Sequence, residues 1–238
     1  MALPPGTLPE IEPVSRESTA AVIARQLRDA IMTGALPPGT QLGETELASR
    51  FQVSRGPLRE AMQHLVSEGL LRSERHRGLF VIDLEPGDVY DIYAARSAIE
   101  RAAMLRALRG DRDRIADVLE QTVVEMATAA SEDDPNALST ADLKFHEALI
   151  NASGSKRLVR MARTLLIETR MCLTALQSTY QRVEERVEEH TKLIQALRDG
   201  DEETALALLE AHMEDAVQRL APGTSLRGGH VPPVPGNA

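Results

Sequence analysis

The chain has 238 residues, 42% of them hydrophobic, and 27 Lys and Arg stand against 36 Asp and Glu for a formal net charge of −9. This length and composition allow one or two packed cores and exclude fibrous and disordered classes. The absence of Trp and an aromatic content of 3% argue against a β-sandwich and against a protein that stacks single-stranded bases on aromatic rings. A mainly helical fold is the better expectation, because Ala, Leu, Arg and Glu favour helices.

The N-terminal residues MALPPGTLPEIEP contain no basic stretch followed by an apolar segment, and no window approaches the roughly 18 apolar residues of a membrane span. We therefore expect a soluble, cytoplasmic protein with no membrane partner. The single cysteine, Cys172, has apolar neighbours at helical spacing, which predicts a buried structural thiol rather than a reactive one.

The net negative charge argues against nucleic-acid binding only until its distribution is considered. Residues 14–83 carry nine Arg against eight acids, whereas residues 84–221 carry seventeen Lys and Arg against twenty-six acids. The basic side chains of the first segment cluster in two places, at Arg50, Arg55 and Arg59 and at Arg72, Arg75 and Arg77. A local basic surface is therefore available despite the acidic total.

Composition along the chain predicts two domains between flexible tails. Residues 1–13 and 222–238 are rich in Pro and Gly with little apolar periodicity, and we expect them to form the tails. Pro86 and Gly87 follow an apolar strand-like run and indicate a domain break. The predicted domains are residues 14–83 and 86–221.

The first domain reads as three helices followed by a hairpin. Apolar residues from Val22 to Ile31 have the spacing of an amphipathic helix that Gly34 can end. A second helix is predicted over residues 44–50. A third begins after Ser54 as N-cap and continues to about residues 68–69, with one apolar face made of Leu58, Ala61, Met62 and Leu65. Residues 70–73 and 79–82 are strand candidates around a basic turn, so the pattern predicts a winged helix-turn-helix whose third helix enters the major groove.

The stretch LGETELASRFQVSRGPLREAMQHLVSEGLLRSERHRGLFVI resembles the DNA-binding domain of the GntR regulators. The VSRGPLREAM core, the EGLL exit and the basic wing follow one another as in that family. Gly43 stands where the family often has Ser, but Gly also serves as an N-cap. Isolated arginines here would be interpreted as solubilising charges; the whole pattern instead implies a homodimer on pseudo-palindromic double-stranded operator DNA. The DNA contacts that the resemblance implies are Thr45, Ser54, Arg55, Gly56, Arg59, His76, Arg77 and Gly78.

The second domain is predicted to be an all-helical bundle of six helices. Breaks fall near Gly110, residues 133–135, Gly154, Tyr180 and Gly200. Asp142 and His146 are four residues apart and share a helix face. His190 lies ten residues before Gly200 and His212 twelve after it. At 1.5 Å per residue these offsets are about 15 and 18 Å along an antiparallel helix pair, so the two histidines are expected nearly level.

One carboxylate and three imidazoles can bind Zn, Ni, Mn or Fe and leave positions open on a six-coordinate metal. Spacing alone favours ordinary helical histidines over ligands. However, DLKFHEAL, HTKLIQALRDGD and ALLEAHMEDA are similar to the ligand-bearing stretches of the FadR-type FCD domain, and six helices fit its shorter, VanR-like form. This resemblance implies a divalent metal held by Asp142, His146, His190 and His212.

Arg96, in AARSAIERAA, matches the family arginine that meets the carboxylate of a small organic acid effector. With Glu100 one helical turn later, Arg96 could instead form an ordinary ion pair on the helix surface. The acidic run of Glu184, Glu185, Glu188 and Glu189 is interpreted as a solvated helix face.

The leading hypothesis is a transcription regulator, repressor or activator, whose operator affinity is controlled by a small carboxylate bound at a metal site. A metal-dependent enzyme is the alternative from another class, since an open metal site can activate water. We expect no enzymatic activity, because no dedicated general base accompanies the ligands and an enzyme would not require the first domain. A regulator that responds to the metal alone is a third reading.

Overall fold

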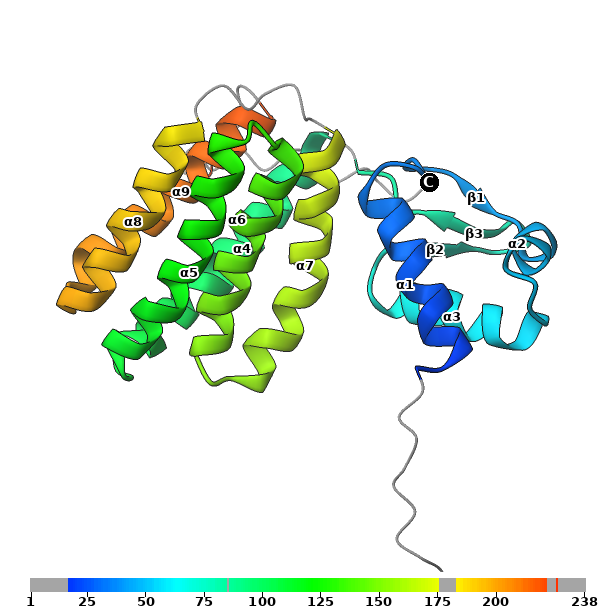
Figure 1. The fold of residues 1–238 in the computed structure, drawn as a ribbon, viewed down its shortest axis with the longest axis horizontal. Coiled ribbons are helices and arrows are strands. Elements are labelled where there is room, and N and C mark those ends of the chain that lie inside the picture. The colour runs from blue at the N-terminus through cyan, green and yellow to red at the C-terminus, as the bar shows by residue number, and fades with distance from the viewer. Residues whose placement is uncertain (1–16, 85, 176–182, 222–225, 227–238) are drawn as a thin grey trace, which may run out of the picture.

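The structure, a computed structural model, describes residues 17–84, 86–175, 183–221 and 226. Within these residues the chain forms a small domain with a short sheet and a larger helical bundle, which lie side by side in Figure 1. The predicted fold class, mainly α with a winged helix-turn-helix and a helical bundle, is confirmed. Apart from Leu226, the tails expected at 1–13 and 222–238 lie outside the described residues.

The small domain contains three helices and three strands. Their bounds are α1 Thr19–Met32, β1 Gln41–Leu42, α2 Glu44–Phe51, α3 Arg55–Ser67, β2 Leu71–Glu74 and β3 Gly78–Val81. The Ser18 hydroxyl accepts a hydrogen bond from the Ala21 N–H and caps α1. At the other end of α1 the chain turns at Gly34, whose φ is 75°, as the sequence predicted.

The sheet is antiparallel in the order β1-β3-β2. β2 and β3 form the predicted wing, each beginning one residue away from the expected position. β1 was not predicted, because two residues are too few to produce an alternating pattern; Gln41 pairs with Phe80 of β3. The predicted apolar face of α3 is buried against α1 and the sheet, and Leu58 and Leu65 have no exposed surface.

The bundle contains six helices in the part of the chain that is described. They are α4 Pro86–Ala107, α5 Arg112–Ser131, α6 Pro135–Ala152, α7 Lys156–Ala175, α8 Val183–Asp199 and α9 Glu202–Leu220. Four of the predicted breaks separate these helices; the fifth, at Tyr180, lies outside the described residues. Gly200, with φ 74°, makes the turn between α8 and α9, and Asp201 caps α9 by accepting from the Thr204 N–H.

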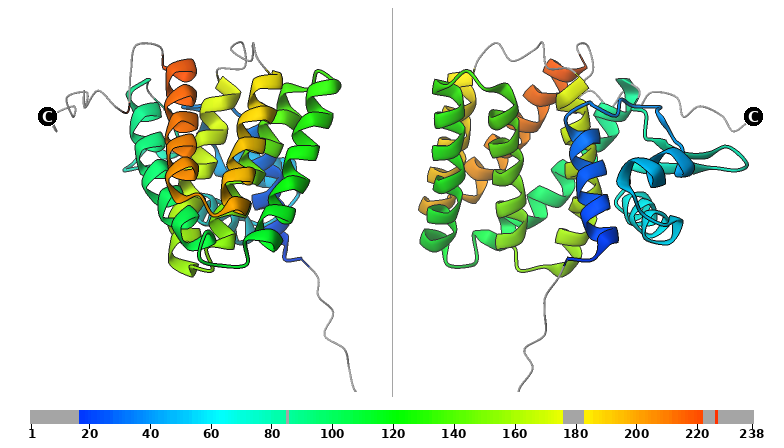
Figure 2. Two further views of the ribbon diagram at one scale, coloured as in Figure 1. Left: turned by 90° about the vertical axis from the view of Figure 1, so that its left-hand side faces the viewer. Right: turned by 45° about the vertical axis from the view of Figure 1, so that its right-hand side comes forward.

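The bundle helices pack as two overlapping groups. α5 packs against α6 and α8, while α4 packs against α6, α7 and α9, so α6 lies between the two groups (Figure 2). Phe145 of α6 is fully buried, as are Met104 of α4 and Met213 of α9. None of the helices described is long and apolar enough to cross a membrane.

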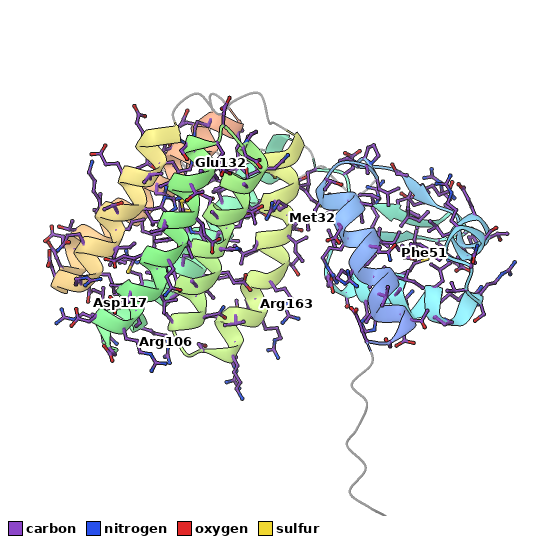
Figure 3. The ribbon with its side chains drawn as sticks, viewed as in Figure 1. Met32, Phe51, Arg106, Asp117, Glu132 and Arg163 are labelled. Carbon is purple, nitrogen blue, oxygen red and sulfur yellow. The ribbon has the colours of Figure 1, made fainter. Side chains whose placement is uncertain are left out.

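α7 belongs to the bundle but also packs against the small domain. Its residue Met171 is buried in the hydrophobic core of the small domain, and Ile167 lies beside it. A Cβ on Gly69 would come within 2.6 Å of Thr164 Cγ2, so the two domains approach closely there. Figure 3 shows Met32 and Arg163 in the region between the domains, where α1 contacts α7. The sequence did not predict this shared helix.

Cys172 is buried in the bundle core, as its neighbours predicted. Burial, with Glu168 and Asp88 nearby, raises the pKa of its thiol to about 12. We expect a chromogenic disulfide reagent at pH 8 to label the folded protein at least about 100-fold more slowly than the urea-unfolded protein. Rapid, stoichiometric labelling of the folded protein would contradict the burial of this side chain.

Candidate metal centre and DNA-binding surface

Three helices of the bundle bring one aspartate and three histidines together. α6 supplies Asp142 and His146, α8 supplies His190, and α9 supplies His212. All four side chains are buried, and one ligand atom from each lies within 4.8 Å of the others. The ring centroids of His190 and His212 are 4.7 Å apart, so the two histidines lie level across the Gly200 turn as expected.

Each of the three imidazoles is held through its Nδ1 atom. The Nδ1 of His146 lies 2.6 Å from Glu100 Oε2, that of His190 lies 2.8 Å from the Arg186 carbonyl oxygen, and that of His212 lies 3.0 Å from Glu189 Oε2. A carbonyl or a carboxylate oxygen accepts a hydrogen bond, so Nδ1 carries the proton in each ring. This leaves the Nε2 atom of each ring directed away from its Nδ1 partner, and metal-binding histidines are held in this same way.

The Nε2 atoms converge on the side chain of Asp142. The Nε2 atoms of His146 and His212 are 3.2 Å apart, and His190 Nε2 lies 3.5 Å from Asp142 Oδ1. His190 Nε2 is buried and makes no hydrogen bond within the described structure. A buried nitrogen without a partner is unfavourable alone, whereas a cation among these atoms would bind all three nitrogens. The donor set fits a divalent transition metal.

The protonation states of the site are those that a metal requires. Burial lowers the pKa of His190 and of His212, with a further contribution from the neighbouring imidazoles, so both rings are neutral at neutral pH. Burial alone would raise the pKa of Asp142, but the guanidinium of Arg186 holds it well below its usual range. The site therefore offers one carboxylate and the neutral imidazoles of His190 and His212.

Arg96 of α4 adjoins this cluster and is also buried. Its Nε donates to Glu100 Oε1 at 3.0 Å, its Nη1 donates to Thr169 Oγ1 of α7 at 3.2 Å, and the guanidinium lies 5.0 Å from the centre of the Tyr93 ring. Nη2 lies 2.9 Å from Glu100 Oε1 but makes no hydrogen bond within the described residues. The interpretation of Arg96 and Glu100 as a surface ion pair is wrong, since their side chains are only 2% and 0% exposed.

Glu100 connects Arg96 to His146, and sequence reasoning missed this role. Burial alone would raise the pKa of Glu100, but His146 and Arg96 lower it to about 2, so it is ionised and accepts from both. The interpretation of the acidic run as a solvated face is also wrong for Glu189, which contacts His212. Glu189 lies eleven residues before Gly200 and His212 twelve after it, so the spacing argument applied to the histidines could have paired them.

The eight residues expected at the DNA are all exposed in the small domain. Arg55 Nη2 lies 3.5 Å from Thr45 Oγ1, and Arg59 Nε lies 2.8 Å from Glu44 Oε2, so the start of α2 lies beside the first turns of α3. Ser54 occupies the N-cap position of α3, but its hydroxyl makes no capping bond to the described backbone. In the wing, Arg77 lies over the ring of Phe80, with its guanidinium carbon 5.1 Å from the ring centre.

Substitution of Arg59 tests whether this surface contacts DNA. If it contacts a base edge, Arg59→Ala should weaken specific DNA binding by about 1–3 kcal/mol. Anisotropy of a labelled duplex from the upstream region of the gene, at fixed salt, measures the change, and Arg114→Ala in the bundle serves as the exposed control. Equal affinity of the Arg59 variant and the wild type would remove Arg59 from the interface.

Residues 19–81 match the family described as bacterial regulatory proteins, gntR family, and residues 91–215 match the FCD domain. The chain belongs to the GntR family. It is a DNA-binding transcription regulator with an FCD domain, and the metalloenzyme alternative is excluded by this membership.

Relatives along nearly the whole chain agree with the GntR assignment. The gluconate operon transcriptional repressor of Bacillus licheniformis is 30% identical over 207 residues, which cover 85% of each chain. The crystal structure of a GntR regulator from Rhodococcus sp. RHA1 has a TM-score of 0.73 at 28% identity and covers 87% of this chain and 100% of that one. McbR/YncC of E. coli has the same fold, with a TM-score of 0.74 at 22% identity over 86% of this chain and 98% of its own.

Proposed function

We propose that this GntR regulator holds a divalent metal through Asp142, His146, His190 and His212, and that a small organic acid bound there controls its affinity for operator DNA. The observation that carries the proposal is the convergence of four buried ligand atoms within 4.8 Å, with every Nδ1 already engaged. A histidine cluster built only for packing has no need to direct three Nε2 atoms at one point.

When bound, the metal would supply a positive centre with open coordination positions for an anion. Arg96 would act with it, because its buried guanidinium shares Glu100 with His146, and its Nη2, 2.9 Å from Glu100 Oε1, makes no hydrogen bond in the described part of the chain. A guanidinium and a metal that face one site would hold a carboxylate by charge-assisted bonds. The ligand class is therefore a small carboxylic acid.

The name of the Bacillus licheniformis relative narrows this class. That protein is a gluconate operon repressor and is 30% identical to this chain over 207 residues. We propose a sugar acid or a related hydroxy acid as the effector, and repression as the sign of regulation. A hydroxy acid can offer both a carboxylate and a hydroxyl oxygen to a metal.

Helix α7 supplies a physical connection between the effector site and the DNA-binding domain. Thr169 accepts a hydrogen bond from Arg96, and Met171, two residues later, is buried in the core of the small domain. An acid that changes the position of Arg96 would therefore act on a helix that both domains share. In a homodimer on a palindromic operator, this coupling requires different acid affinities in the DNA-bound and free arrangements.

Calorimetry on the purified protein tests the proposal. Metal content is measured after loading with Zn, Ni or Mn, and gluconate, L-lactate and uncharged glucose are then titrated into metal-loaded and chelator-stripped protein. We expect stoichiometric metal, and binding of the acids by the loaded protein alone. A protein that takes up no metal, or that binds glucose and gluconate with equal affinity, contradicts the proposal. If metal without any acid changes the affinity for DNA, the regulator that responds to metal alone is favoured.

A further inference from the structure

Arg186 is a second buried arginine at the candidate metal centre. It lies on α8 four residues before His190, and its side chain is 7% exposed. Its Nη1 donates to Asp142 Oδ1 at 3.1 Å, the oxygen that also lies 3.5 Å from His190 Nε2. The guanidinium therefore contacts the only carboxylate of the four-residue donor set.

Two buried ion pairs flank the site when no metal is counted. Arg96 is paired with Glu100, and Arg186 is paired with Asp142, and all four side chains are buried. Glu189, with 32% of its side chain exposed, adds a further negative charge beside His212. A divalent cation bound to Asp142 would add two positive charges beside Arg186. In a buried site, like charges repel far more strongly than in water.

The guanidinium of Arg186 lies at the donor set itself. The Asp142 Oδ1 that it contacts lies 3.5 Å from His190 Nε2, and the other oxygen of that carboxylate lies 3.8 Å from His146 Nε2. Arg96 is connected to the same set through Glu100, which contacts His146. An anion placed among these groups would be attracted by two guanidinium groups and by the metal together.

We propose that Arg186 competes with the metal for Asp142 and that a bound carboxylate relieves this competition, so that the metal and the organic acid bind tightly only together. The inference rests on the proposed function and adds its regulation: the site would hold metal weakly alone and firmly in the presence of the acid. By reciprocity, the factor by which the acid strengthens metal binding equals the factor by which the metal strengthens acid binding.

The test compares wild type with Arg186→Met, which keeps the apolar stem and removes the charge. Metal affinity is measured by competition with a chromophoric chelator, with and without saturating gluconate, and the weak complex of gluconate with free metal is subtracted from a titration without protein. We expect gluconate to raise the metal affinity of wild type about tenfold or more. Without gluconate, the variant should bind metal about tenfold more tightly than wild type, and gluconate should add less than about threefold.

Arg198→Met is the matched control, because it removes an arginine of the same helix that pairs with Asp117 and Glu120 away from the site. It should behave as wild type. If Arg186→Met lowers the affinities for metal and for gluconate together, Arg186 is only structural and the inference fails. If wild type binds both ligands without mutual enhancement, the inference fails while the proposed function stands; if wild type binds no metal, both fail.

A thermal melt followed by circular dichroism shows whether Arg186→Met folds. If it does not fold, Arg186→Lys serves as the second test variant. Lysine retains the charge but lacks the planar fork that matches a carboxylate. Metal affinity without gluconate should stay within about threefold of wild type, and the enhancement by gluconate should fall about tenfold. An undiminished enhancement in this variant would overturn the role given to Arg186.

Discussion

His190→Ala is expected to lower the affinity of the protein for a divalent metal by at least about 100-fold, more than the 10–100-fold typical of losing an outer-shell partner. His190 has no exposed side-chain surface, its Nδ1 is fixed by the Arg186 carbonyl, and its Nε2 is directed at Asp142. Alanine removes one of the three nitrogen donors of the site. Chelator competition gives the affinity.

Operator binding distinguishes a His190→Ala protein that has lost only its metal from one that has not folded. The winged domain does not contain the donor set, so His190→Ala should bind the operator duplex as wild type does in the absence of gluconate, and gluconate should no longer change that binding. His64→Ala, which removes an exposed histidine of α3 that lies 3.8 Å from Glu60, is the control for metal affinity. Metal binding that survives in His190→Ala would exclude this histidine as a ligand.

Glu100→Gln is expected to lower the free energy of unfolding by about 3–5 kcal/mol, the usual effect of removing one member of a buried ion pair. The amide oxygen could still accept from His146 Nδ1, but it would leave the Arg96 guanidinium without a buried countercharge. Urea unfolding of the metal-free protein measures the change. Metal affinity should also fall about 10–100-fold, because His146 loses its charged partner.

Glu125→Gln is the matched control for this variant. Glu125 pairs with Lys144, and the two side chains are 50% and 51% exposed. Exposed pairs of this kind contribute about 0–1 kcal/mol. Equal losses of unfolding free energy in the two variants would contradict the prediction that the buried network of Arg96, Glu100 and His146 stabilises the fold more than an exposed ion pair does.

The order of elements could be predicted from the sequence because local signals mark it. Gly110, Gly154 and Gly200 fall at helix boundaries of the bundle, and apolar spacing in α3 identifies the face that is buried. The approach of His190 and His212 followed from counting residues on either side of one turn. These are short-range properties, and each depends on one helix or one hairpin.

The missed features depend on contacts between distant elements. Glu100 follows Arg96 by four residues, which is the spacing of an ordinary ion pair on a helix surface. Only the packing of α6 and α7 around α4 places Glu100 in the interior. Arg186 and Glu189 occur in an acidic, polar run, although Arg186 and the neighbouring His190 are buried. Met171 lies on a helix whose apolar positions serve two cores, so a single-face interpretation of α7 could not assign it to the small domain.

Operator binding by metal-loaded protein, with and without gluconate, tests the central claim most directly. Anisotropy of a labelled duplex from the upstream region, with a shuffled duplex as control, is measured at about 0.15 M salt before and after the metal is stripped. We predict specific binding that gluconate weakens when the metal is present and leaves unchanged when it is absent. A gluconate response that persists in metal-free protein, or operator affinity that no carboxylate changes in loaded protein, would contradict the account.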